Sequence, residues 1–102
     1  MVKNRLTLQA LLEELIGSKN VYYRPPENTK MQYPCIRYNR DNIVGEHADN
    51  VMYRKTNRYL LIVIDKNPDN PVIEKLLELP MCQFDRHYET DNLNHDVLVI
   101  YY

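Results

Sequence analysis

The sequence predicts an α+β domain: a mainly antiparallel β-sheet with two helices packed on one of its faces. Two segments carry apolar residues at helical spacing, and five carry the alternating or continuous apolar patterns of strands. Polar turns between several strands favour hairpins, which make a sheet antiparallel. The predicted order is therefore α-β-β-β-α-β-β, in a single domain that spans residues 1–102.

The first predicted helix begins close to the N-terminus. Its apolar residues recur at three- and four-residue spacing and form one stripe, consisting of Leu8, Leu11, Leu12, Leu15 and Ile16. Asn4 or Thr7 can cap its first turn. Gly17 suits the left-handed backbone conformation with which many helices end.

Three strands are predicted before the second helix. Residues 20–24 form a short one, which Pro25 and Pro26 end because proline cannot donate a backbone hydrogen bond. Residues 33–40 alternate between two faces, and residues 53–65 give the clearest strand, which closes in an apolar run.

Residues 41–52 show no periodicity and are rich in Asp, Asn, Glu and His, which are typical of irregular loops. A loop of this length is unusual in so small a domain, and long loops are often functional or mobile. We therefore predict that residues 41–55 are an assembly loop, loose in the free subunit and ordered on binding another chain. The residues expected to make this contact are Asp49, Asn50, Tyr53, Arg54, Lys55 and Arg58.

The second predicted helix lies within residues 66–80. Asp69 or Asn70 can cap it, Pro71 suits its first turn, and Pro80 ends it. Its buried stripe should consist of Val72, Ile73, Leu76 and Leu77.

A hairpin closes the domain, with strands at residues 82–89 and 94–102 and a polar turn between them. The last strand is apolar on both faces. It must therefore be covered on both sides, either by its own domain or by a neighbouring chain. The residues at its end, expected at an interface or in the core, are Tyr101 and Tyr102.

Composition argues against several classes of function. The formal net charge of −1 does not suit a dedicated duplex-DNA binder, which needs a basic excess to displace counterions. Two glycines are too few for a phosphate-binding glycine loop, and no apolar run approaches the roughly 20 residues of a membrane span. Cys35 and Cys82 lie far apart and outside any CxxC pair, which favours free thiols over a disulfide or a zinc site.

Two groups of polar residues can in principle carry chemistry. His47 and Asp49 can bind a metal, but no fourth ligand lies in register, so a solvated loop is the favoured interpretation. The last hairpin gathers His87, Glu89, Asp91, His95 and Asp96. These can supply a general base, although alternating polar residues are also typical of a solvent-facing strand. We predict no catalytic residue, no metal site and no cofactor, and thus a protein that is not an enzyme.

Basic and aromatic residues are interleaved over the middle strands. The basic residues are Arg37, Arg40, Arg54, Lys55 and Arg58, and the tyrosines are Tyr33, Tyr38, Tyr53 and Tyr59. This mixture is compatible with contact to single-stranded nucleic acid and with a protein interface. Tyrosines that pack inward beside solvated charges are a further interpretation, and this one and the protein interface are both favoured over nucleic-acid contact.

Three stretches resemble the small tail-completion or tail-terminator proteins of long-tailed bacteriophages and prophages. Residues 21–41 combine a strand, a proline-bearing loop and a Pro-x-Ile-x-Tyr strand. Residues 48–69 hold an Ala-Asp-Asn-x-x-Tyr segment followed by Tyr59, which is the most specific part of the resemblance. The helix and hairpin from Pro71 to the final tyrosines complete a resemblance that spans nearly the whole chain.

The resemblance implies a structural tail protein that forms a ring, expected to be a hexamer, capping the tail tube and joining it to the head connector. The implied partners are further copies of the chain, the tail tube protein and the head-closure or connector protein. DNA would pass through the lumen without sequence-specific binding, and no membrane is involved. The implied location is the virion, at the tail or neck, and the host cytoplasm during assembly. The alternatives are another head–tail neck protein or a small nucleic-acid-binding module.

Overall fold

A computed structural model describes residues 4–25, 30–48 and 51–102, with residues 46–48 and 51–54 described by their backbone alone. The elements are α1 (Arg5–Ile16), β1 (Val21–Tyr23), β2 (Cys35–Ala48), β3 (Val51–Asp65), α2 (Val72–Leu77), β4 (Cys82–Thr90) and β5 (Leu93–Tyr101). The predicted α+β class and the order α-β-β-β-α-β-β are therefore confirmed. No helix in these described ranges is long and apolar enough to cross a membrane.

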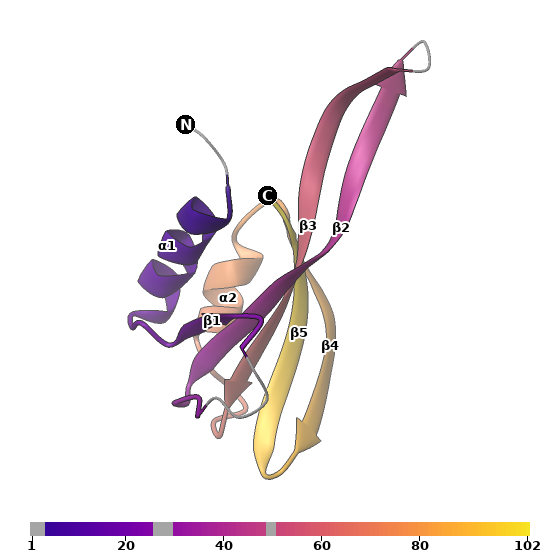
Figure 1. Cartoon of the computed structure of the whole chain (residues 1–102). Helices are drawn as coiled ribbons and strands as arrows, with labels where there is room; N and C mark the ends of the chain where they lie inside the picture. The colour runs from indigo at the N-terminus through magenta and orange to yellow at the C-terminus, as the bar shows by residue number, and fades with distance from the viewer. Residues whose placement is uncertain (1–3, 26–29, 49–50) are drawn as a thin grey trace.

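The five strands form one mixed sheet in the order β1-β2-β3-β5-β4 (Figure 1). β1 runs parallel to β2, and the other neighbouring strands are antiparallel. β5 lies between β3 and β4, and its central residues Val97, Leu98, Val99 and Ile100 are all buried. The prediction that the last strand is covered on both faces is thus confirmed, and the domain itself supplies the cover.

Both helices lie on the same face of the sheet, as predicted (Figure 1). α1 contributes Leu8 and Leu12 to the core, and α2 contributes Val72 and Leu76. They pack against the strand residues of that face, which include Val21, Ile36, Tyr38, Tyr59, Leu61, Val63, Leu98 and Ile100. Burying one large apolar side chain contributes roughly 1.5–3 kcal/mol before entropy is counted, so this layer is the main source of stability.

Short-range chemistry sets the ends of the helices. The Asn4 side chain accepts a hydrogen bond from the Thr7 amide, and the Thr7 hydroxyl accepts one from the Asn4 amide, both at 3.0 Å. This reciprocal pair is a capping box. Gly17 ends α1 with a φ of +77°, a conformation that glycine adopts without steric cost. At the start of α2, Asn70 Oδ1 accepts a hydrogen bond from the Val72 amide at 2.9 Å.

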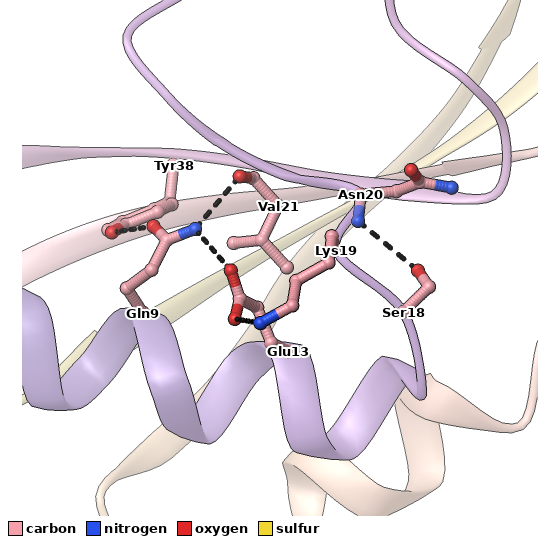
Figure 2. Close-up of polar contacts among 7 residues, drawn as sticks. All are labelled: Gln9, Glu13, Ser18, Lys19, Asn20, Val21 and Tyr38. Carbon is pink, nitrogen blue, oxygen red and sulfur yellow. Dashed lines mark hydrogen bonds and ion pairs between the residues drawn. The ribbon is translucent and has the colours of Figure 1, made fainter.

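A polar network ties α1 to the first two strands (Figure 2). The Gln9 amide group donates to Glu13 Oε2 at 3.1 Å and to the Val21 carbonyl at 2.9 Å, while the Tyr38 hydroxyl donates to Gln9 Oε1. Lys19 Nζ forms an ion pair with Glu13 Oε1 at 3.2 Å. The hydrogen bonds from Gln9 and then Lys19 lower the pKa of Glu13. The amide nitrogen and the amide oxygen of Gln9 thus both hold the helix against the sheet.

The prediction of an irregular loop at residues 41–52 is wrong. Among these residues, 41–48 continue β2 and 51–52 begin β3, and the ladder between the two strands extends to Ala48 and Val51. The loop-like composition arises because this part of the hairpin stands apart from the core. Strands with no apolar face to bury show no hydrophobic alternation, which is the pattern that identifies strands in a sequence.

The outer part of the β2–β3 hairpin projects beyond the rest of the molecule (Figure 1). We call residues 41–48 and 51–56 the arm, and the rest of the described chain the body. The arm makes the molecule elongated, with principal extents of 51 × 25 × 23 Å. The body alone contains the buried core.

Candidate functional site

The strands of the arm pair only with each other in the part of the chain that the structure describes. β1 pairs with residues 36–38 of β2, and β5 pairs with residues 58–65 of β3, so neither reaches the arm. Both edges of the arm therefore present unpaired backbone groups, to which a strand of another chain can add. An isolated two-stranded ribbon is at best marginally stable in water, so such a partner would also stabilise it.

The arm also exposes apolar side chains. Ile43 is 46% exposed and Val44 is 42% exposed, and they lie opposite Asn57 and Thr56 in the ladder. Consecutive residues of a strand point to opposite faces, so each face of the arm carries one of the two apolar side chains. A partner chain can therefore gain apolar contact from either side.

A bulge and an ion pair mark the point where the arm leaves the body. The register of the β2–β3 ladder shifts between Arg40 and Asn42, which leaves Asp41 outside the regular pairing. Bulges of this kind bend a strand and increase its twist. Asp41 Oδ1 lies 3.7 Å from Arg58 Nε across the hairpin. The acidic and basic partners thus tie the two strands together at the bend.

A hollow of about 630 Å³ lies where the arm meets the body, and we call it the arm-base hollow. Its lining residues come from β2, β3 and the two ends of the last hairpin: Val44, Lys55, Thr56, Asn57, Met81, Tyr101 and Tyr102. The Tyr101 amide donates to the Met81 carbonyl at 3.0 Å, and the Tyr102 amide donates to the Asn57 carbonyl at 2.9 Å. The Tyr102 hydroxyl donates to Thr7 Oγ1 at 3.0 Å. The two predicted tyrosines are therefore half-buried and form one wall of the hollow.

Only some of the predicted contact residues lie at the arm-base hollow. Lys55 and Arg58 lie in β3 at the base of the arm, and Lys55 lines the hollow. Tyr53 and Arg54 lie further out in the same strand. The two remaining predicted residues, Asp49 and Asn50, fall outside the described residues. The four described positions, residues 53–55 and 58, belong to a paired strand and not to a loop, and their contact with another chain stays a prediction.

Of the two residues considered as metal ligands, His47 belongs to β2 and is described by its backbone alone, and Asp49 lies outside the described residues. Over the ranges with described placement, no group of three or more histidine, cysteine, aspartate or glutamate residues is arranged to hold a metal ion.

The last hairpin pairs one histidine with a carboxylate. His87 Nδ1 lies 2.7 Å from Asp96 Oδ1, whereas His95 stacks on Tyr88 with ring centroids 4.7 Å apart. A histidine–carboxylate pair can serve as a base where a reactive group lies beside it. The thiol of Cys82, on the same hairpin, is buried, and burial raises its pKa to about 11, which keeps it protonated near neutral pH. The pair is thus better suited to joining β4 to β5 than to nucleophilic catalysis.

The interleaved tyrosines and basic residues separate into two environments. Tyr38 and Tyr59 are buried on the helix side, with ring centroids 6.1 Å apart, whereas Arg37 and Arg40 are exposed. A base cannot stack on a buried ring, so these two tyrosines offer no platform for single-stranded nucleic acid. Tyr33 is exposed, but it lies before β2 begins.

The sequence did not indicate several further residues around the hollow and on β4. Val44 and Met81 line the arm-base hollow, and Phe84 and Tyr88 are exposed on β4. Only the exposed aromatic residues on a strand rich in charge gave a signal in the sequence. The proximity of Val44 to Met81 depends on the path of the hairpin and left no local pattern.

The described arm is a two-edged ribbon with a partly apolar hollow at its base, an arrangement that another chain can contact. No known protein family matches the chain, and no curated protein is detectably related to it. The fold itself and the resemblance in the three sequence stretches are accordingly the grounds for a functional proposal.

Proposed function

We propose that this protein is a structural subunit of a long-tailed bacteriophage that assembles into a ring, capping the tail tube and joining it to the head connector. One observation carries the proposal: a long β-ribbon with both edges unpaired and with exposed Ile43 and Val44 projects from a well-packed body. A projecting ribbon of this kind gains stability when another chain covers it. The resemblance to tail-terminator proteins supplies the ring, its expected six copies and its place on the tail.

The partners of the proposed ring are copies of itself, the tube protein on one side and the head-closure protein on the other. DNA passes through the lumen, and the near-neutral net charge suits passage without sequence-specific binding. Another neck protein of the head–tail connection would assemble through the same kind of contact. A nucleic-acid-binding role is less well supported because Tyr38 and Tyr59 are buried.

Sedimentation equilibrium over a wide concentration range tests the self-assembly. We expect reversible association that ends at one closed species, with rings in negative-stain electron micrographs. A protein that stays monomeric up to its solubility limit would contradict the proposal. A gel-shift assay with single- and double-stranded DNA, run in parallel, would instead support the nucleic-acid alternative if it gave tight binding.

The double substitution Tyr53→Ala, Arg54→Glu tests the role of the arm in particles. Both positions lie in the outer part of β3, away from the core cluster, so we expect a folded subunit. We expect heads and tails that fail to join. The matched control is Lys30→Glu, which changes an exposed position of the body. Normal yields of infectious particles from the double variant would remove the arm from the mechanism.

A further inference from the structure

The charges of the chain are unevenly divided along its length. Residues 1–60 hold ten basic and six acidic side chains, whereas residues 61–102 hold three basic and eight acidic ones. The arm itself is balanced, with Arg54 and Lys55 against Asp41 and Glu46, so the charge that matters at its base is that of individual side chains. In the β3–β5 ladder, Arg58 pairs with Tyr101 at one end and Asp65 pairs with Asn94 at the other. The arm and the β4–β5 turn consequently lie at opposite ends of the sheet (Figure 1).

The arm-base hollow combines apolar and basic groups. Val44, Met81 and Tyr101 contribute apolar surface to it, and the exposed Lys55 contributes a positive charge. Arg40 is exposed in the adjoining part of β2. A ligand that fits this place should itself combine apolar side chains with negative charge.

The outer edge of β4 has that complementary character. β4 is the last strand of the sheet and pairs with β5 alone in the described structure, so its other edge is open. It exposes two aromatic side chains, Phe84 at 46% and Tyr88 at 38%, together with the exposed carboxylates of Asp85 and Glu89. Arg86 Nη1 lies 3.7 Å from Asp85 Oδ2 and offsets that charge, so Glu89 carries the unbalanced negative charge of the strand. Asp91 adds a further negative charge in the turn. We call Phe84, Asp85, Tyr88, Glu89 and Asp91 the acidic edge.

We propose that the acidic edge of one copy docks at the arm-base hollow of the next copy. The inference rests on the proposed self-assembly, and it names the two surfaces that meet. Within one chain the arm and the β4–β5 turn lie at opposite ends of the sheet, so a contact between them joins two molecules (Figure 1). Such a contact is heterologous, and repetition of it closes a ring when the rotation per copy permits. A nucleic acid would match the basic hollow, but it would leave the exposed aromatic and acidic groups of β4 without a role.

Paired cysteine substitutions test the contact directly. The native thiols of Cys35 and Cys82 are buried, and burial raises the pKa of each to about 11, so they react slowly with maleimides. Lys55→Cys and Glu89→Cys introduce one exposed thiol on each surface. With a short bismaleimide, we expect the double variant to give a ladder of covalent oligomers that ends at the size of the ring. We expect the two single variants to give a covalent heterodimer only when they are mixed.

The controls and outcomes separate this inference from the proposed function. The matched control, Lys30→Cys with Glu89→Cys, should give no ladder. A wild-type protein that associates while the Lys55→Cys, Glu89→Cys variant does not crosslink would overturn the docking inference and leave the proposed ring intact. A product that stops at a dimer would overturn it as well, because it indicates a reciprocal contact. A wild-type protein that remains monomeric would overturn both.

Charge reversal provides a second measurement. Lys55→Glu and Glu89→Lys, each alone, should weaken self-association by at least about tenfold, because like charges then meet across the contact. The two variants mixed in equal amounts should associate with each other, since both contacts between unlike copies are then complementary, one with the original pair of charges and the other with the pair reversed. Equal association of wild type and both variants at low salt would contradict the proposed pair of surfaces.

Discussion

Strands β2 and β3 run through both the body and the arm, and the apolar side chains that the structure describes in them are mostly buried in the body and exposed in the arm. In the body, β1 and β5 flank the two strands and the helices cover one face, so Ile36, Tyr38 and Leu61 are fully buried. In the arm the same ladder continues without either flank, and Ile43 and Val44 are exposed. Backbone pairing is present in both parts. The stability of the domain should therefore depend on the body, and the arm should contribute chiefly to contacts with other chains.

Of the changes that test this difference between body and arm, removal of the last strand should destabilise the protein most. Deleting residues 98–102 removes buried Leu98, Val99 and Ile100 from the strand between β3 and β4. Each buried side chain of this kind contributes roughly 1.5–3 kcal/mol, which together approaches the total stability of a small domain. We expect insoluble or unfolded protein, as judged by yield and far-UV circular dichroism. A soluble, cooperatively folding truncation would show that the body does not depend on β5.

Matched truncations of apolar side chains should separate body from arm. Leu61→Ala in the body removes a fully buried side chain, and we expect a loss of about 2–5 kcal/mol in the free energy of unfolding. Val44→Ala in the arm should change it by less than about 0.5 kcal/mol, since the residue is 42% exposed and lies outside the core cluster. Urea denaturation of both variants measures the difference. Similar losses would mean that the arm is part of the cooperative unit.

The cap of α1 should have an intermediate effect. Asn4→Ala removes the acceptor of the Thr7 amide and one half of the capping box. We expect a loss of about 1 kcal/mol in the free energy of unfolding, the usual value for such a cap. Asn4→Ser is the matched control, because serine can accept the same hydrogen bond, and it should retain most of the stability. Equal losses in the two variants would assign the effect to something other than the cap.

Excision of the arm should have the smallest effect on stability and a decisive one on assembly. Ile43 and Asn57 lie opposite each other, so an Asn-Gly turn can join them in place of residues 44–56. We expect the free energy of unfolding to change by less than about 0.5 kcal/mol, because the core cluster is untouched. Self-association measured by sedimentation should disappear. An excised protein that still assembles would place the contact surface in the body.

The sequence by itself determined the element order and several details of local structure. The capping box at Asn4, the left-handed Gly17 and the turn at Asp91 and Asn92, whose φ angles of 53° and 61° suit a tight hairpin, all depend on residues close together in the chain. The two-sided burial of the last strand also followed from its sequence, because only a central strand is apolar on both faces.

The tertiary structure alone decided the arm and the surfaces around it. Residues 41–52 look like a loop because exposed strands carry no apolar alternation, and their pairing comes from backbone hydrogen bonds that leave no mark on side-chain type. The inward packing of Tyr38 and Tyr59 and the placement of Val44 and Met81 around one hollow likewise involve residues far apart in the chain. Such contacts depend on how the whole sheet is assembled, and a local pattern cannot specify them.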